Sequence, residues 1–276
     1  AVIGDSAASG VGDSDGYGNY FGWAYHLAQA FEEPITFINV SRPGAQSFEV
    51  LEQQLPNVLI HEPTLVAVIV GGNDLLRNGF SPKRFQSNLN QTLRKIEECG
   101  AISMLLELHD PTKIVPMPGL LKSVCIRRVD AVNAITRNLA ARYGSILLRT
   151  RSLSDIYNVE KWHVDRMHPS RHGHQFIADS FAELLRNRGF LIGNVDVNAA
   201  NNRSRKDSIL WMLRNGTPWF LKRSVDLLPA LLFLMVQEFI SQKVRSGRKR
   251  EAELLFPPFE KTCENKQENF SHQRVS

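Results

Sequence analysis

Short apolar runs alternate with longer amphipathic stretches along the first two thirds of the chain. The runs are rich in Val, Ile and Leu and show no polar face, which is typical of strands in a parallel sheet covered on both sides. Their alternation with helical patterns predicts an α/β fold. The predicted strands are residues 1–3, 35–40, 65–70, 102–106 and 145–148.

The stretches between these runs carry helix signals. Ser81 followed by Pro82 is typical of an N-cap and a first helical position, and Gly100 is typical of a helix end. Apolar residues recur every three or four positions in three stretches, so each predicts a helix with one buried face. The result is a three-layer α/β/α sandwich with a five-stranded parallel sheet. The predicted buried positions are Phe85, Leu89, Leu93 and Ile96; Ile126, Val129, Val132, Ile135 and Leu139; and Ile177, Phe181 and Leu184.

The composition changes after residue 193. Residues 194–202 are rich in Asn and small side chains, which indicates a linker. An apolar, Trp-containing segment at 209–240 and a charged end at 241–276 follow. We therefore predict one domain at 1–193 and an extension at 194–276, in which a linker leads to an apolar helical segment and a charged, flexible tail.

The basic character of the chain belongs to this extension. Residues 200–276 hold 14 Lys and Arg against 8 Asp and Glu, and the whole chain has a formal net charge of +5. Two interpretations of the apolar segment stay open. It is a helix packed on the first domain or on a second subunit, or it makes a peripheral membrane contact through 209–250, where apolar burial and basic flanks add. The basic clusters at 127–128 and 248–250 are interpreted as solvated faces, so no nucleic-acid partner is expected.

The sequence favours a cytoplasmic location. The longest apolar run, 227–236, contains Pro229 and is far shorter than the roughly 20 residues that a spanning helix needs. No signal peptide is recognisable. The three cysteines have no metal-type spacing and cannot all pair with one another, which favours a reducing compartment. The pattern does not specify an oligomeric state.

Polar and glycine-containing motifs follow the first three predicted strands, at the sheet edge where open α/β folds bind ligands. Ser6 lies in the motif GDS after the first strand, Gly44 follows the second, and Asn73 lies in the motif GGND after the third. A serine at a strand end is accessible but needs an adjacent base to react. The Gly44 N–H and the Asn73 amide can donate to a developing oxyanion.

The motif D-x-x-H at Asp165 and His168 can supply that base. An Asp three residues before a His can fold back in one turn, so that its carboxylate reaches the imidazole Nδ1 and Nε2 faces a serine. Pro169 keeps His168 extended and outside the following helix, which Ser170 can cap. These residues predict Ser6 as nucleophile, His168 as base and Asp165 as the group that orients it.

Together these motifs, in this order, resemble the SGNH, or GDSL-type, hydrolase family across residues 1–191. The resemblance implies a flavodoxin-like fold and a serine esterase or lipase that cleaves carboxylic esters through an acyl-enzyme intermediate. It implies a triad of Ser6, His168 and Asp165, and an oxyanion hole formed by the Ser6 N–H, the Gly44 N–H and the Asn73 side chain. No metal and no organic cofactor is implied, and the partner is a small-molecule or lipid ester: short acyl esters, lipids or acetylated compounds.

Two other functions stay open. A metallophosphoesterase takes Asp, Asn and His from several strand ends, and Asp5, Asp74, Asp165 and His168 could serve as its ligands. Such enzymes place His after the strand-end Asn, where this chain has Asp74 after Asn73, and this difference argues against that function. A non-catalytic binding protein could keep the same fold, but the presence of every expected catalytic residue type argues against it.

Overall fold

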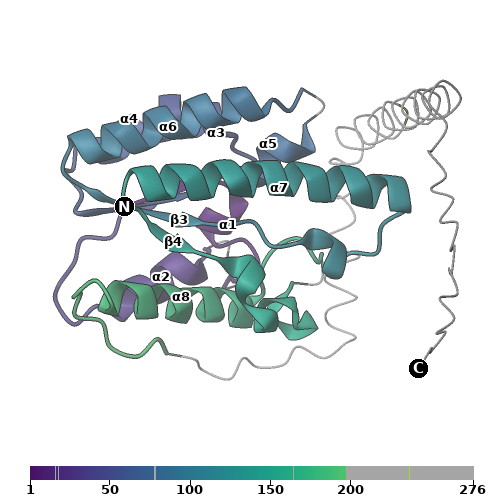
Figure 1. The fold of residues 1–276 in the computed structure, drawn as a ribbon. Coiled ribbons are helices and arrows are strands. Elements are labelled where there is room, and N and C mark those ends of the chain that lie inside the picture. Colours follow the sequence, from purple (N-terminus) through teal and green to yellow (C-terminus); the bar gives the residue numbers. More distant parts are fainter. Residues whose placement is uncertain (16, 18, 78, 164, 197–235, 237–276) are drawn as a thin grey trace, which may run out of the picture. The chain divides into compact units, whose positions relative to one another are not determined.

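The computed structural model describes residues 1–15, 17, 19–77, 79–163, 165–196 and 236. Its centre is a parallel sheet of four strands, which neighbour one another in chain order (Figure 1). The register aligns Gly4 with Ile69 and Leu106 with Leu148, so the carboxyl ends of the strands lie along one edge. The strands are β1 (Val2–Gly4), β2 (Leu65–Ile69), β3 (Ile102–Leu106) and β4 (Ile146–Leu148).

The prediction of a fifth strand at 35–40 is wrong for the described residues. This segment does run beside β1, where Val2 N donates to Ile38 O at 2.8 Å and Val40 N donates to Val2 O at 3.1 Å. Only Asn39 forms a parallel bridge with Val2. The side chains of Ile35 and Phe37 are 44% and 38% exposed. A segment that is paired on one side and covered poorly on its faces does not develop a full ladder.

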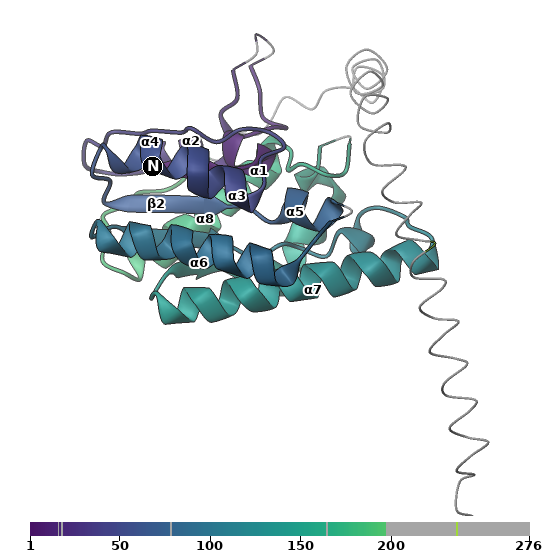
Figure 2. The same ribbon diagram turned by 90° about the horizontal axis from the view of Figure 1, so that it is seen from above.

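Helices cover both faces of the sheet, so the three-layer α/β architecture is confirmed. Helices α2 and α8 lie against one face, and α4, α6 and α7 lie on the other (Figures 1 and 2). The α-helices are α1 (Ser6–Ser9), α2 (Gly22–Gln29), α3 (Ser47–Glu49), α4 (Leu55–Leu59), α5 (Gly72–Leu76), α6 (Pro82–Glu98), α7 (Gly119–Arg142) and α8 (Arg171–Arg186). A π-helical turn, η1 (Val50–Gln54), joins α3 to α4, and 3-10 turns occupy η2 (Pro111–Lys113), η3 (Thr150–Ser152), η4 (Ser154–Tyr157) and η5 (Val159–Lys161).

The helix signals are confirmed where local chemistry decides them. The Ser81 side chain caps α6 by accepting from Arg84 N, and Pro82 is the first helical residue. Ser170 caps α8 by accepting from Gly173 N. The predicted apolar face of α6 is fully buried, and each such side chain contributes about 1.5–3 kcal/mol through burial. Its members are Phe85, Leu89, Leu93 and Ile96.

Most of the predicted extension at 194–276 lies outside the described residues. Apart from residues 194–196 and 236, the predicted linker, apolar helical segment and charged tail fall on 197–235 and 237–276, and so does nearly all of the proposed membrane contact at 209–250. Within the part of the chain that is described, no helix has both the length and the apolar character that crossing a membrane requires.

Candidate active site

Ser6 begins α1 immediately beyond the carboxyl end of β1. Gly4 makes this possible, because it has a φ of +146° and a Cβ there would lie 2.1 Å from Ile69 O. The buried Gln54 side chain holds both backbone groups of Gly4, accepting from its N–H at 2.7 Å and donating to its carbonyl at 3.0 Å. The strand therefore approaches β2 closely and delivers Ser6 at a fixed position.

Asp5 lies beneath this turn. Its Oδ1 accepts from Ala7 N at 3.0 Å and thereby caps α1, and its Oδ2 is 3.5 Å from the Asn73 amide nitrogen. The side chain is buried, and burial raises the pKa of the carboxyl from 3.8 to about 6. Asp5 therefore joins the turn after β1 to the turn after β2.

His168 reaches Ser6 from a loop that lies 162 residues away in the sequence. Its Nε2 is 2.8 Å from Ser6 Oγ, and its Nδ1 is 2.8 Å from Asp165 Oδ2. The other carboxylate oxygen, Asp165 Oδ1, accepts from the backbone N–H groups of Met167 and His168 at 2.9 and 3.0 Å. The structure thus brings together the three residues that the sequence predicts, in the order serine, imidazole, carboxylate.

The electrostatics of Asp165 suit an anion. Burial alone would raise its pKa, but the contacts with the His163 and His168 side chains, the positive potential of His168 and the Met167 N–H hold the pKa well below its ordinary value. A carboxylate that stays charged can hold an imidazole in one tautomer and stabilise the imidazolium.

Backbone contacts fix the loop that carries His168. His163 N donates to His168 O at 2.9 Å, and Trp162 pairs with Pro169 in an antiparallel bridge. On the other side, Gly12 packs against Pro169 so closely that a Cβ would lie 2.0 Å from the proline carbonyl oxygen. The loop is therefore closed by its own backbone contacts and held against the turn after α1.

Asn73 and Gly44 come together through Ala45. Asn73 lies in the first turn of α5, and its amide nitrogen donates to Ala45 O at 3.2 Å. Gly44 lies in the preceding turn, which closes with a 3.1 Å hydrogen bond from Ala45 N to Arg42 O. Both predicted oxyanion donors therefore belong to the same loop cluster at the carboxyl edge of the sheet.

Asp74, the residue after Asn73, holds this loop cluster together through hydrogen bonds to Ser47. Its carboxylate accepts from the backbone N–H and the hydroxyl of Ser47 at 3.0 and 2.5 Å, and Asn88 donates to the same hydroxyl at 3.0 Å. Burial raises the pKa of Asp74 above its ordinary value. Asp74 is thus occupied in joining α3 to α5.

The described residues contain no group of three His, Cys, Asp or Glu side chains arranged to hold a metal ion. His174, which follows the triad loop, bonds the backbone: its Nδ1 accepts from Trp23 N at 3.1 Å and its Nε2 donates to Val11 O at 3.0 Å. Complete burial lowers its pKa to about 4, so it is neutral at pH 7. Its position and bonds are those of a structural residue between α2 and α8.

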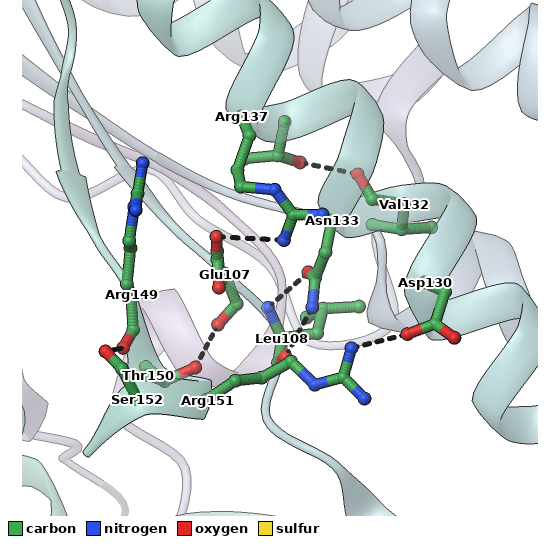
Figure 3. A network of polar contacts seen from close by, with 11 residues as sticks. Glu107, Leu108, Asp130, Val132, Asn133, Arg137, Arg149, Thr150, Arg151 and Ser152 are labelled. Carbon is green, nitrogen blue, oxygen red and sulfur yellow. Dashed lines mark hydrogen bonds and ion pairs between the residues drawn. The ribbon is translucent and has the colours of Figure 1, made fainter. Parts of the chain in front are cut away.

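Sequence reasoning missed a polar clamp at the end of β3 (Figure 3). The Asn133 side chain accepts from Leu108 N at 2.8 Å and donates to Leu108 O at 2.7 Å, while Thr150 Oγ1 donates to Glu107 O at 2.6 Å. Arg137 pairs with the buried Glu107 carboxylate at 3.2 Å. Its signal in the sequence is a polar residue, Asn133, among the mostly apolar residues of the buried face of α7.

The residue that follows the clamp in the sequence contacts the segment before His168. This residue, His109, places its ring 4.1 Å from that of Trp162, centroid to centroid. Burial lowers the pKa of His109 to about 4, so it packs as a neutral ring. The carboxyl end of β3 therefore supports the segment before His168.

Comparisons with known proteins place the chain in a family and identify structures with a similar fold. The family model described as the GDSL-like lipase/acylhydrolase family matches residues 2–176. A thioesterase 1/protease 1/lysophospholipase L1 of Escherichia coli K12 is 29% identical over 186 residues, which cover 67% of this chain and 81% of that protein. An arylesterase of Vibrio mimicus is 30% identical over 155 residues, covering 55% and 71%. The crystal structure of a psychrotrophic esterase, EstA from Pseudoalteromonas sp., inhibited by monoethylphosphonate, superposes with a TM-score of 0.52 at 21% identity, covering 68% of this chain and 97% of that one.

Proposed function

Because the chain belongs to the GDSL-like lipase/acylhydrolase family and is therefore a carboxylic ester hydrolase, we propose that Ser6 is its nucleophile. His168 is the general base and Asp165 orients and stabilises it. The observation that carries this proposal is the chain of two 2.8 Å contacts, from Ser6 Oγ to His168 Nε2 and from His168 Nδ1 to Asp165 Oδ2. Nucleophile, base and orienting carboxylate within hydrogen-bond reach are the signature of serine acyl transfer.

The reaction proceeds in two halves. His168 Nε2 takes the Ser6 proton as Ser6 Oγ attacks the ester carbonyl, and Asp165 stabilises the imidazolium that forms. The C–O bond to the alcohol then breaks, and His168 returns the proton to the leaving alkoxide, which leaves an acyl-Ser6 ester. His168 then takes a proton from water as the water oxygen attacks this ester, the bond between the acyl carbon and Ser6 Oγ breaks, and His168 returns the proton to Ser6 Oγ as the acid leaves. Side chains and backbone of this chain supply every group that these steps require.

The tetrahedral oxygen needs donors on the opposite side of the carbonyl from His168. We assign this role to the Ser6 N–H, the Gly44 N–H and the Asn73 amide. Two observations support the assignment: Ser6 N is a first-turn amide of α1, and Asn73 is held beside the Gly44 turn through Ala45 O. Donors fixed before the reaction stabilise the developing charge without reorganising.

The substrate class that we propose is a small-molecule or lipid ester, of the short acyl, lipid or acetylated kind. The relatives support this breadth, since their names include a thioesterase, a lysophospholipase and an arylesterase. Family membership favours ester hydrolysis over the metallophosphoesterase alternative. Measurable ester turnover distinguishes a hydrolase from a non-catalytic binding protein with the same fold.

The test is hydrolysis of a chromogenic short-chain ester by the Ser6→Ala variant. We expect kcat to fall by about 10⁴-fold or more, because triad members act as a unit. Ser123→Ala is the matched control, since Ser123 is an exposed serine on α7 whose hydroxyl donates to the Gly119 carbonyl in its own helix. Wild-type turnover by the Ser6→Ala variant would refute the assignment.

A further inference from the structure

A second histidine lies against the carboxylate of Asp165. His163 Nδ1 is 3.4 Å from Asp165 Oδ2, the same oxygen that lies 2.8 Å from His168 Nδ1. His163 belongs to the same turn, because its N–H donates to His168 O and its carbonyl accepts from Arg166 N, each at 2.9 Å. Its side chain is 16% exposed, so the contact is largely shielded from solvent.

The two oxygens of this carboxylate are divided between different partners. Oδ1 accepts the backbone N–H groups of Met167 and His168, which closes the turn. Oδ2 faces both imidazoles, so the charge that stabilises a protonated His168 is shared with His163. An interaction of the carboxylate with one imidazole weakens its electrostatic stabilisation of the other imidazole.

We propose that His163 is a positioning residue that shares the Asp165 carboxylate with His168 and so extends the enzyme's activity to lower pH. The proposal rests on the proposed function, in which His168 must be neutral to accept the Ser6 proton. By competing for Oδ2, His163 weakens the stabilisation of the His168 imidazolium. Less of the carboxylate's charge is then available to the imidazolium that forms when His168 accepts the Ser6 proton.

Other titratable groups face this pair and must stay unchanged in the test. Asp5 faces His168 from the start of α1, and His174 faces it from α8. His109 lies behind Trp162, and Lys161 and Arg166 belong to the same loop. A variant confined to His163 leaves all of these groups in place, so a shift in the pH profile reports on the shared carboxylate.

The experiment compares the pH dependence of kcat/KM for wild type, His163→Phe and His163→Asn on a soluble ester. Phe fills the space without a donor, whereas the Asn amide nitrogen can take the place of Nδ1. We expect the rising limb of His163→Phe to move up by about half to one pH unit, because the carboxylate is then unshared. Activity at about pH 6, relative to the same variant at about pH 8, then falls about three- to tenfold below the wild-type ratio. The Asn variant should stay near wild type.

The matched control is His61→Phe, at an exposed histidine before the amino end of β2, which should leave the limb in place. An unchanged or downward-shifted limb in His163→Phe would overturn the proposal, and so would an Asn variant that behaves like the Phe variant. Normalising each variant to its own activity at high pH removes losses due to misfolding. Failure of the proposed function is a separate outcome, since it would appear as turnover by Ser6→Ala.

Discussion

Replacing Asp5 tests how much free energy of unfolding the protein loses by holding a carboxylate at the active-site turn. Its carboxyl is buried below the turn after β1, where it caps α1 through Ala7 N. Asp5→Asn keeps the oxygen that accepts this hydrogen bond but removes the ionisable group. The variant therefore isolates the free-energy cost of holding a charge at this position.

The magnitude follows from the pKa of Asp5. Burial raises it from 3.8 to about 6, so the folded state keeps a proton that the unfolded state has already lost. Stability therefore falls as the pH rises from about 4 to about 6, and one pKa unit corresponds to about 1.4 kcal/mol. Asn carries no such penalty. The gain in free energy of unfolding from Asp5→Asn should be larger at about pH 7.5 than at about pH 4.5, by about 2 kcal/mol.

Urea unfolding of both proteins at the two pH values measures this quantity. Comparing the gain at one pH with the gain at the other cancels any constant effect of exchanging the side chains. Asp179→Asn, at an exposed position on α8, is the control and should show the same effect at both pH values. A gain from Asp5→Asn that is equal at the two pH values, or smaller at high pH, would refute the reasoning.

Two further outcomes are expected. Asn73→Ala should lower kcat by about 10²-fold while the protein stays folded, because one oxyanion donor is lost; an unchanged kcat in the steady-state assay would remove Asn73 from the site. Exhaustive chelation with EDTA should leave esterase activity intact, since the proposed steps use only side chains and backbone; loss of activity restored by Mn²⁺ or Zn²⁺ would favour the metallophosphoesterase alternative instead.

Much of the fold could be predicted because local signals agreed with burial. The cap at Ser81, the apolar face from Phe85 to Ile96 and the buried runs of β2 and β3 all point to the same structure. The segment 35–40 has the same apolar character as those strands. Whether it joins the sheet depends on its neighbours in space, and among the described residues its sheet partner is β1 alone. The pattern of apolar residues within a segment does not show which segments lie beside it in the fold.

The candidate site divides in the same way. Ser6 and Asn73 could be predicted as candidates because their chemistry coincides with a strand-end position, and Asp165 and His168 because they form a short D-x-x-H motif. The polar groups that support them could not, because Gln54 and Asn133 act through tertiary contacts with distant backbone. In the sequence, a helical Asn or Gln that bonds water cannot be distinguished from one that is buried and bonds the backbone of a neighbouring strand.

The central claim, that Ser6 is activated by His168, is tested most directly by finding the residue that a phosphonate probe modifies. The enzyme is incubated with a fluorophosphonate, digested, and analysed by peptide mass spectrometry, in parallel with His168→Ala. The account predicts one adduct, on Ser6, formed rapidly by wild type and far more slowly by the variant. An adduct on another residue with Ser6 unmodified, or labelling of Ser6 in His168→Ala at the wild-type rate, would contradict it.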